Sequence, residues 1–219
     1  MQQELMLEWE RKIGQRDGRE VYNPAKYVQF HREFVNTMYP FFGLKENPGY
    51  VRQIVVRPML FCGGLTTTKK KGQFRIFISD YTESYKKRDD EYIVYHESAH
   101  FLDAIVNFDR IKQRLKRKPT SDMSRDEIIA DFASLEYIAL TEGEEEAMKF
   151  TDYGSSYGKV AGELFVKMIG NVDERRKLLL GLVNGKLQEV YPYLLSILNL
   201  SMLYDDKTER TIKSSFMKT

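Results

Sequence analysis

Apolar residues recur with helical spacing between positions 91 and 107 and divide this segment into two faces. On a helix, one broad arc collects the bulky apolar side chains: Val94, Tyr95, Ala99, Phe101, Leu102, Ile105 and Val106. The opposite wedge holds the polar side chains His96, Glu97, His100 and Asp103. Acidic residues at 89–91 precede the pattern and suit the positive end of a helix dipole. The segment therefore predicts an amphipathic helix whose polar stripe consists of side chains able to bind a metal.

A second segment with the same period follows at 124–139. Its apolar arc consists of Ile128, Ile129, Phe132, Leu135 and Ala139. Glu127 and Asp131 are four residues apart, so both carboxylates lie on one face of this second predicted helix. Between 50 and 80 the pattern is different: residues 51–57 are rich in β-branched side chains, and 74–78 carry one bulky residue after another. These stretches predict a small sheet.

The ends of the chain are typical of helical regions. Residues 1–46 predict helices broken at 14–18, at 23–24 and at Pro40. Residues 157–204 predict helices interrupted near 170–171, 184–185 and Pro192, and 208–219 resemble a frayed polar tail. We therefore expect an α+β fold in which a small sheet packs on the helix of residues 91–107. With 219 residues, the chain suits a single domain over 1–219, or one domain with lobes at 1–107 and 108–219.

The composition argues against several classes of protein, among them nucleic-acid-binding and membrane proteins. A net charge of +2 is too small to indicate a nucleic-acid partner, and the basic clusters at 69–71, 86–88 and 114–118 contain few aromatic residues. The single cysteine excludes an intramolecular disulfide and suits a reducing compartment. No signal peptide pattern and no apolar run long enough for a bilayer are apparent. We expect a cytoplasmic protein without a membrane or nucleic-acid partner.

The polar stripe of the first helix contains the motif His96-Glu97-Ser98-Ala99-His100. Residues i and i+4 lie one above the other on a helix, so both imidazoles can bind one tetrahedral zinc ion. Glu97 lies slightly off that axis, where it can serve a water at the metal as general base. The chain has only three histidines, and this motif contains two of them. A surface helix with two solvated histidines is the simpler alternative.

A catalytic zinc site needs a third protein ligand. The metzincin pattern would place glycine at 103 and histidine at 106, but the chain has Asp103 and Val106 there. His31 lies in an apolar stretch typical of a structural histidine, and Cys62 does not match the cysteine loop of peptide deformylases. Glu127 can complete a His₂Glu set, and Asp131 can then orient a ligand imidazole. The alternative for Glu127 is a helix capping box with Ser124.

With these residues, the chain resembles the gluzincin metallopeptidases. In that group, a His-Glu-x-x-His helix is followed by a second helix with a glutamate ligand and an acidic residue four positions later. The resemblance covers 96–100 and 127–131 with the surrounding helices, and it does not resolve the subfamily. It implies a zincin-like fold, with His96, His100 and Glu127 as zinc ligands, Glu97 as general base and Asp131 beside a ligand histidine.

The expected function is a zinc-dependent peptidase that hydrolyses peptide or protein substrates with Glu97 as general base. Two alternatives stay open: a zinc amidohydrolase for a non-peptide substrate, and a regulatory binding protein on the same scaffold with little or no proteolysis. Tyr153 or Tyr157, in a flexible turn at 151–158, can supply an oxyanion donor, although packing in the core or on the surface is the usual role of a tyrosine side chain. Residues 74–78 are the candidate strand for pairing with substrate, with an interior strand as the alternative.

Overall fold

The computed structural model describes residues 20–57, 59, 64–68, 73–79, 89–108, 122–152 and 156–185. Its helices are α2 (Ala25–Met38), the short 3₁₀ helix η1 (Tyr39–Phe42), α3 (Asp89–Val106), α5 (Asp122–Glu142), α6 (Glu144–Met148), α7 (Ser156–Lys167) and α8 (Val172–Asn184). Its strands are β1 (Val21–Tyr22), β2 (Gln53–Arg57), β3 (Gly64–Thr68) and β4 (Phe74–Ser79). This is an α+β architecture, and the predicted sheet between 50 and 80 and both predicted central helices are present.

The four strands form one mixed sheet in the order β1-β2-β4-β3. β2 and β4 are parallel, whereas β3 pairs antiparallel with β4, with Gly64 opposite Ile78 and Thr66 opposite Ile76. β4 is therefore an interior strand, and the interpretation of residues 74–78 as the substrate-pairing rim is wrong. A strand with bulky residues at successive positions suits an interior place, because both of its faces meet other atoms. Among the described strands, β3 is the outermost strand on this side of the sheet.

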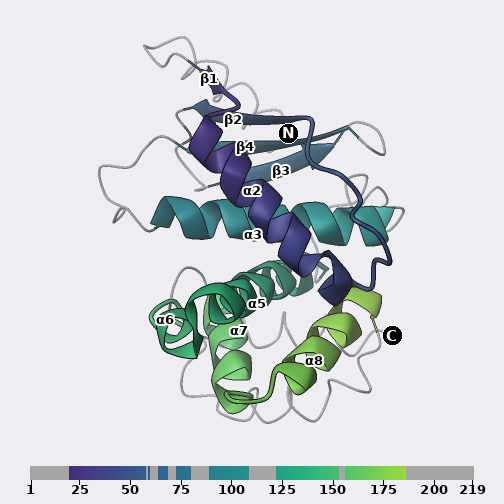
Figure 1. Ribbon diagram of the computed structural model, residues 1–219, viewed down its shortest axis with the longest axis vertical. Coiled ribbons are helices and arrows are strands. Elements are labelled where there is room, and N and C mark those ends of the chain that lie inside the picture. Colours follow the sequence, from purple (N-terminus) through teal and green to yellow (C-terminus); the bar gives the residue numbers. More distant parts are fainter. Residues whose placement is uncertain are drawn as a thin grey trace.

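Helix α3 lies against the sheet, and α2 crosses both of them (Figure 1). Ile54, Ile76 and Ile78 from the sheet form a buried cluster with Val94 of α3. Nearby, the Phe74 and Phe101 rings meet edge to face with centroids 5.2 Å apart. This contact fixes which side of α3 faces the strands.

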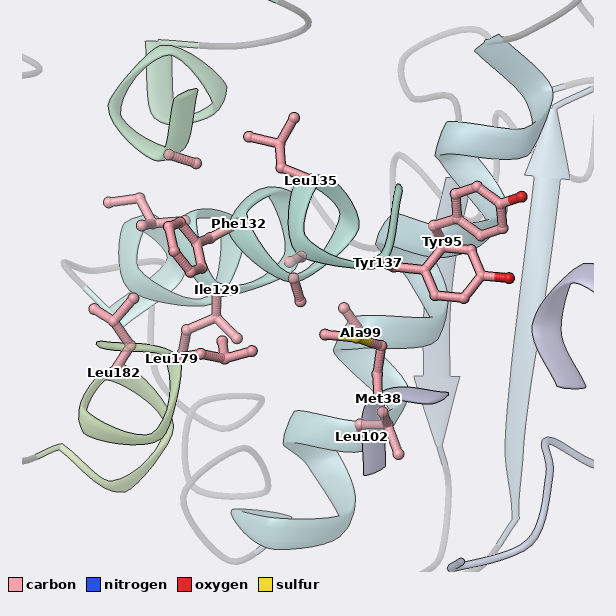
Figure 2. Packing of buried hydrophobic residues seen from close by; sticks show 14 of the residues in the cluster. Met38, Tyr95, Ala99, Leu102, Ile129, Phe132, Leu135, Tyr137, Leu179 and Leu182 are labelled. Atoms are coloured by element: carbon pink, nitrogen blue, oxygen red, sulfur yellow. The ribbon is translucent and has the colours of Figure 1, made fainter. Parts of the chain in front are cut away.

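The opposite side of α3 packs on a layer of helices (Figure 1). Figure 2 shows its centre, where Tyr95, Ala99 and Leu102 of α3 approach the residues of α5. The rings of Tyr95 and Tyr137 lie 4.6 Å apart, and Leu179 and Leu182 of α8 cover the far part of α5. α3 is thus enclosed by the sheet on one side and by helices on the other. Its polar wedge meets β3 at Glu97 and α5 at His96 and His100, and Glu97 and Asp103 are only 4% and 1% exposed.

The outer regions follow the sequence predictions in part. The break at 170–171 is present, since Asn171 caps α8 by accepting a hydrogen bond from the Glu174 amide, and α8 ends before Gly185 with φ 70°. The prediction of helices over 1–46 holds for α2 and η1, but Val21 and Tyr22 pair with β2 instead. The expectations for 1–19 and 186–219 lie outside the described residues. In the part of the chain that the structure describes, no helix is long and apolar enough to cross a membrane.

Candidate metal centre

Three side chains from two helices converge at the junction of α3 and α5. The Nε2 atoms of His96 and His100 lie 3.0 Å apart. Glu127 approaches both rings, with Oε2 3.2 Å from His96 Nε2 and Oε1 3.5 Å from His100 Nε2. One ligand atom from each of the three residues lies within 4.8 Å of the other two. Among the described residues, this is the one group of histidine, cysteine and acidic side chains arranged to hold a metal ion.

The cluster is partly accessible. The side chains of His96 and His100 are 17% and 18% exposed, and that of Glu127 is 34% exposed. A fully enclosed cluster would suit a structural metal, whereas an accessible one leaves a position for a water or a substrate. The exposure of these three side chains is therefore of the kind that a catalytic centre needs.

Asp131 holds the ring of His96 from the other side. Its Oδ1 atom lies 2.7 Å from His96 Nδ1, and the Tyr92 hydroxyl donates to the same oxygen across 3.1 Å. An ionised carboxylate only accepts hydrogen bonds, so Nδ1 carries the proton and donates it. The Nε2 lone pair of a neutral ring is then directed toward the cluster. The hydrogen bond predicted between Asp131 and the outer nitrogen of one of the two histidines is confirmed.

Tyr92 is a residue of this site that the sequence analysis missed. It lies one helical turn before His96, and its ring stacks on Phe150 with centroids 5.4 Å apart and planes inclined by 5°. The spacing of four residues from His96 was a usable signal, because it places the tyrosine above the same acidic partner. Without the position of Asp131, the residue resembles the other aromatic side chains of the core.

The three converging groups perturb one another strongly. Burial alone lowers the pKa of His96, but the charge of Asp131 and the hydrogen bonds that Asp131 and Glu127 accept outweigh it and raise that pKa well above its usual value. For His100, burial likewise lowers the pKa, but Glu127 raises it by more, so the net shift of the pKa is upward. Burial raises the pKa of Glu127, yet the two histidines bring it far below the ordinary range. The shifts share one cause, because the negative charges of Asp131 and Glu127 favour positive charge on the two histidines.

The donor set fits zinc. Two imidazole nitrogens and the oxygens of one carboxylate converge on a common point, which is the donor set of a His₂Glu zinc site. Two of the ligands come from adjacent turns of one helix and the third from a helix packed against it, so the backbone already holds them in place. Without a metal ion, a proton shared between these side chains keeps the same atoms of His96, His100 and Glu127 together.

Glu97 lies beside the cluster, between α3 and β3. Its side chain is 4% exposed, and Oε2 is buried without a hydrogen-bond partner among the described residues. A buried carboxylate oxygen without a partner is costly unless it serves a ligand or a reaction. Glu97 thus follows His96 directly in the chain and has one carboxylate oxygen that no described residue occupies.

Two other candidate ligands, His31 and Asp103, are not part of this cluster. His31 is buried and uses both ring nitrogens elsewhere: Nδ1 lies 2.8 Å from Ser98 Oγ, and Nε2 accepts from the Val51 amide across 3.1 Å. Asp103 accepts a hydrogen bond from Asn107 and is fully buried. Cys62 lies outside the described residues.

The capping-box alternative for Glu127 disagrees with the helix start. α5 begins at Asp122, so Ser124 already lies within the helix rather than at its N-cap. Tyr153 lies outside the described residues. Tyr157 belongs to the first turn of α7 instead of a flexible turn, and its side chain lies outside the described part. The prediction of an oxyanion donor at either tyrosine stays a prediction.

No protein-family model matches this chain, and no curated protein or solved structure matches it significantly.

Proposed function

We propose that this protein is a zinc-dependent peptidase of the gluzincin type, built on a zincin-like fold. The observation that carries the proposal is the convergence of His96, His100 and Glu127 next to the buried Glu97, whose Oε2 has no partner among the described residues. His₂Glu is a recurring ligand set of catalytic zinc, with the fourth position left to water or substrate. Either feature alone has a simpler explanation, but their juxtaposition on α3 and α5 meets the requirements of one reaction.

His96, His100 and Glu127 would hold the zinc, and Asp131 would keep His96 in the tautomer that offers its Nε2 lone pair. Bound zinc would supply a Lewis acid that polarises the scissile carbonyl and lowers the pKa of the attacking water. Glu97 takes the proton from that water and returns it to the departing amine. Its carboxylate suits this role because no hydrogen bond to the described protein residues occupies Oε2.

The sheet favours a peptide over another amide as substrate. β3 touches α3 at Glu97, where Thr66 Oγ1 donates to the Glu97 carbonyl across 2.8 Å. Within the described residues, no strand pairs with the other side of β3. An extended chain that adds to such an edge is recognised through its backbone and lies beside the base. A small non-peptide amide would make no use of this edge.

The first test is metal content. Protein purified without added metal is expected to contain about one zinc per chain, since three protein ligands and one open position form a single site. Mass spectrometry that finds no zinc, together with no uptake after dialysis against zinc, would contradict the proposal.

The second test separates hydrolysis from binding. Glu97→Gln should keep the zinc and lose most cleavage of a peptide library, because an amide cannot accept the proton of the water. Glu91→Gln is the matched control, since Glu91 lies on the same helix and pairs with Lys26 on the side of α2. Equal cleavage by the parent and Glu97→Gln would refute the role of Glu97. A zinc-loaded parent that cleaves no peptide would favour the regulatory binding protein.

A further inference from the structure

We infer that strand β3 positions the carboxylate of Glu97 through Gly64 and Thr66. The strand that offers its edge to the substrate would then also hold the base in place. The inference rests on the proposed function only in giving Glu97 the role of base. The contacts between β3 and Glu97 can be tested without that role.

Gly64 lies directly against the Glu97 side chain. A Cβ atom at position 64 would lie 2.5 Å from Glu97 Cγ, 2.6 Å from Oε1 and 2.9 Å from Cδ, all closer than real Cβ atoms come. Gly64 is not among the described glycines with positive φ, so its backbone conformation does not require glycine. What requires glycine is the close approach of the Glu97 side chain to the strand.

Thr66 holds the backbone of the same glutamate. Its hydroxyl donates to the Glu97 carbonyl across 2.8 Å, and it lies two residues from Gly64. Side chains two residues apart on a strand face the same side. Their partners in register, Ile76 and Ile78, are fully buried and pack with Val94 of α3. Positions 64 and 66 therefore both face α3, one at the carboxylate of Glu97 and the other at its carbonyl.

Packing must fix the carboxylate because hydrogen bonds do not hold both of its oxygens. Oε2 has no partner among the described residues, and the side chain is 4% exposed. The backbone at Gly64 is thus the surface against which Glu97 rests. Misplacing a catalytic group by about 1 Å can reduce a rate by about 10²-fold. A methyl group at position 64 would displace Glu97 by a distance of this order while leaving the metal ligands on α3 and α5 in place.

The contact is tested first by a stability cycle on the zinc-loaded protein. Gly64→Ala is expected to lower the melting temperature by about 3–8 °C when Glu97 is present, because the added methyl overpacks the site. In the Glu97→Ala background the same substitution should change it by less than about 2 °C, since the clashing atoms are gone. An equal loss in both backgrounds would overturn the inference. This readout requires no activity.

The positioning role is tested by kinetics on the same proteins. Gly64→Ala should reduce kcat by about 10–100-fold with KM and zinc content nearly unchanged, because the substrate edge and the ligands stay intact. Thr66→Val should reduce kcat less, by about 3–10-fold, and it carries the test if Gly64→Ala does not fold. Thr141→Val is the matched control, because it removes a hydroxyl that donates to the Tyr137 carbonyl at the far end of α5, and it should match the parent.

A Gly64→Ala or Thr66→Val protein with the parent's kcat would overturn the positioning role. A decrease that appears only in KM would do the same, because it would mean that β3 acts on substrate binding alone. Absence of cleavage by the parent would refute the proposed function, while the stability cycle still decides whether Gly64 sets the position of Glu97.

Discussion

Asp131 holds His96 through a 2.7 Å hydrogen bond to Nδ1, while Glu127, one turn earlier on α5, lies 3.2 Å from Nε2 of the same ring. Both nitrogens of one imidazole are thus engaged by carboxylates from a single face of the neighbouring helix. One carboxylate fixes the tautomer and orientation of the ring, and the other completes the cluster. Because Glu127 and Asp131 are four residues apart on α5, both reach this ring, and they contact different nitrogens of it.

Substitution of Glu127 and substitution of Asp131 should therefore reduce zinc affinity by different amounts. Glu127→Ala removes a ligand and should weaken zinc binding severely, whereas Asp131→Ala should weaken it by on the order of 10–100-fold. Tyr92→Phe removes only one of the two donors to Asp131 and should have the smallest effect. Titration against a competing chelator gives the three affinities in one series.

A capping role for Glu127 makes the opposite prediction. Zinc affinity would then be unchanged in Glu127→Ala, and stability would fall by only about 1 kcal/mol. An order in which Asp131→Ala is more harmful than Glu127→Ala would show that the third ligand is Asp131 or another residue.

Zinc affinity should depend on pH because the metal-free cluster retains a proton. The pKa values of His96 and His100 are raised against the lowering effect of burial, chiefly by Asp131 and Glu127, so protons and zinc compete near neutral pH. Affinity should rise with pH and level off above the raised pKa of His96. Calorimetry in two buffers of different ionisation enthalpy should show release of about one proton per zinc at pH 7. Equal affinity at pH 6 and pH 8 would contradict this competition.

The two helices of the site were predictable because their signals are local. Helical spacing places His96 above His100 and Glu127 above Asp131, and the apolar residues around each pair define the face that packs. A hydrogen bond from Asp131 to one of the two rings followed from the chemistry that metal-binding histidines require, but the sequence did not show which ring it would be. No long-range contact had to be known for either inference.

The surroundings of Glu97 were not predictable in the same way. They depend on β3 pairing at the outer edge of β4, although β3 lies between β2 and β4 in the chain. Local periodicity carries no information about this order of strands, so residues 74–78 resembled a rim strand as much as an interior one. For the same reason, Gly64 gave no signal: its close approach to Glu97 exists only after the sheet has formed.

His31 should make stability depend on acid pH. Its Nε2 accepts from the Val51 amide and its Nδ1 bonds Ser98, so the buried ring is neutral, and burial lowers its pKa from about 6.5 to about 4. The unfolded chain therefore binds a proton that the folded protein excludes. Stability is retained above about pH 6.5 and is lost as the pH falls toward 4.

The non-titrating variant His31→Gln isolates this contribution. Between pH 7 and pH 5 the parent should lose about 2 kcal/mol more unfolding free energy than the variant, because all other groups titrate in both proteins. Urea denaturation of the zinc-loaded proteins at the two pH values gives the difference. The variant's lower stability at pH 7 does not enter this comparison, because only the change between the two pH values is used. Equal changes in unfolding free energy in both proteins would show that His31 is protonated in the folded state as readily as in the unfolded chain.

Arg175 joins the helices on the far side of α5. It is 1% exposed and donates to Glu136 of α5, to Glu144 of α6 and to the Met168 carbonyl, while its guanidinium lies 5.0 Å from the centroid of the Phe165 ring. Burial raises the pKa of Glu136 even though Arg175 lowers it, so this carboxylate is stable as an anion only beside its partner. The ion pair therefore holds α8 and α6 on the helix that carries Glu127.

Removing one partner of such a pair should be much worse than removing both. Arg175→Ala leaves Glu136 buried and unpaired and should reduce the unfolding free energy by about 3–5 kcal/mol. Combining Arg175→Met with Glu136→Leu should recover most of that loss, because apolar side chains of similar size replace the pair. Urea denaturation with zinc bound measures both changes. Zinc affinity should stay at the parent value in the double variant, since neither residue contacts the cluster, and a double variant as unstable as Arg175→Ala would show that packing rather than charge pairing stabilises this junction.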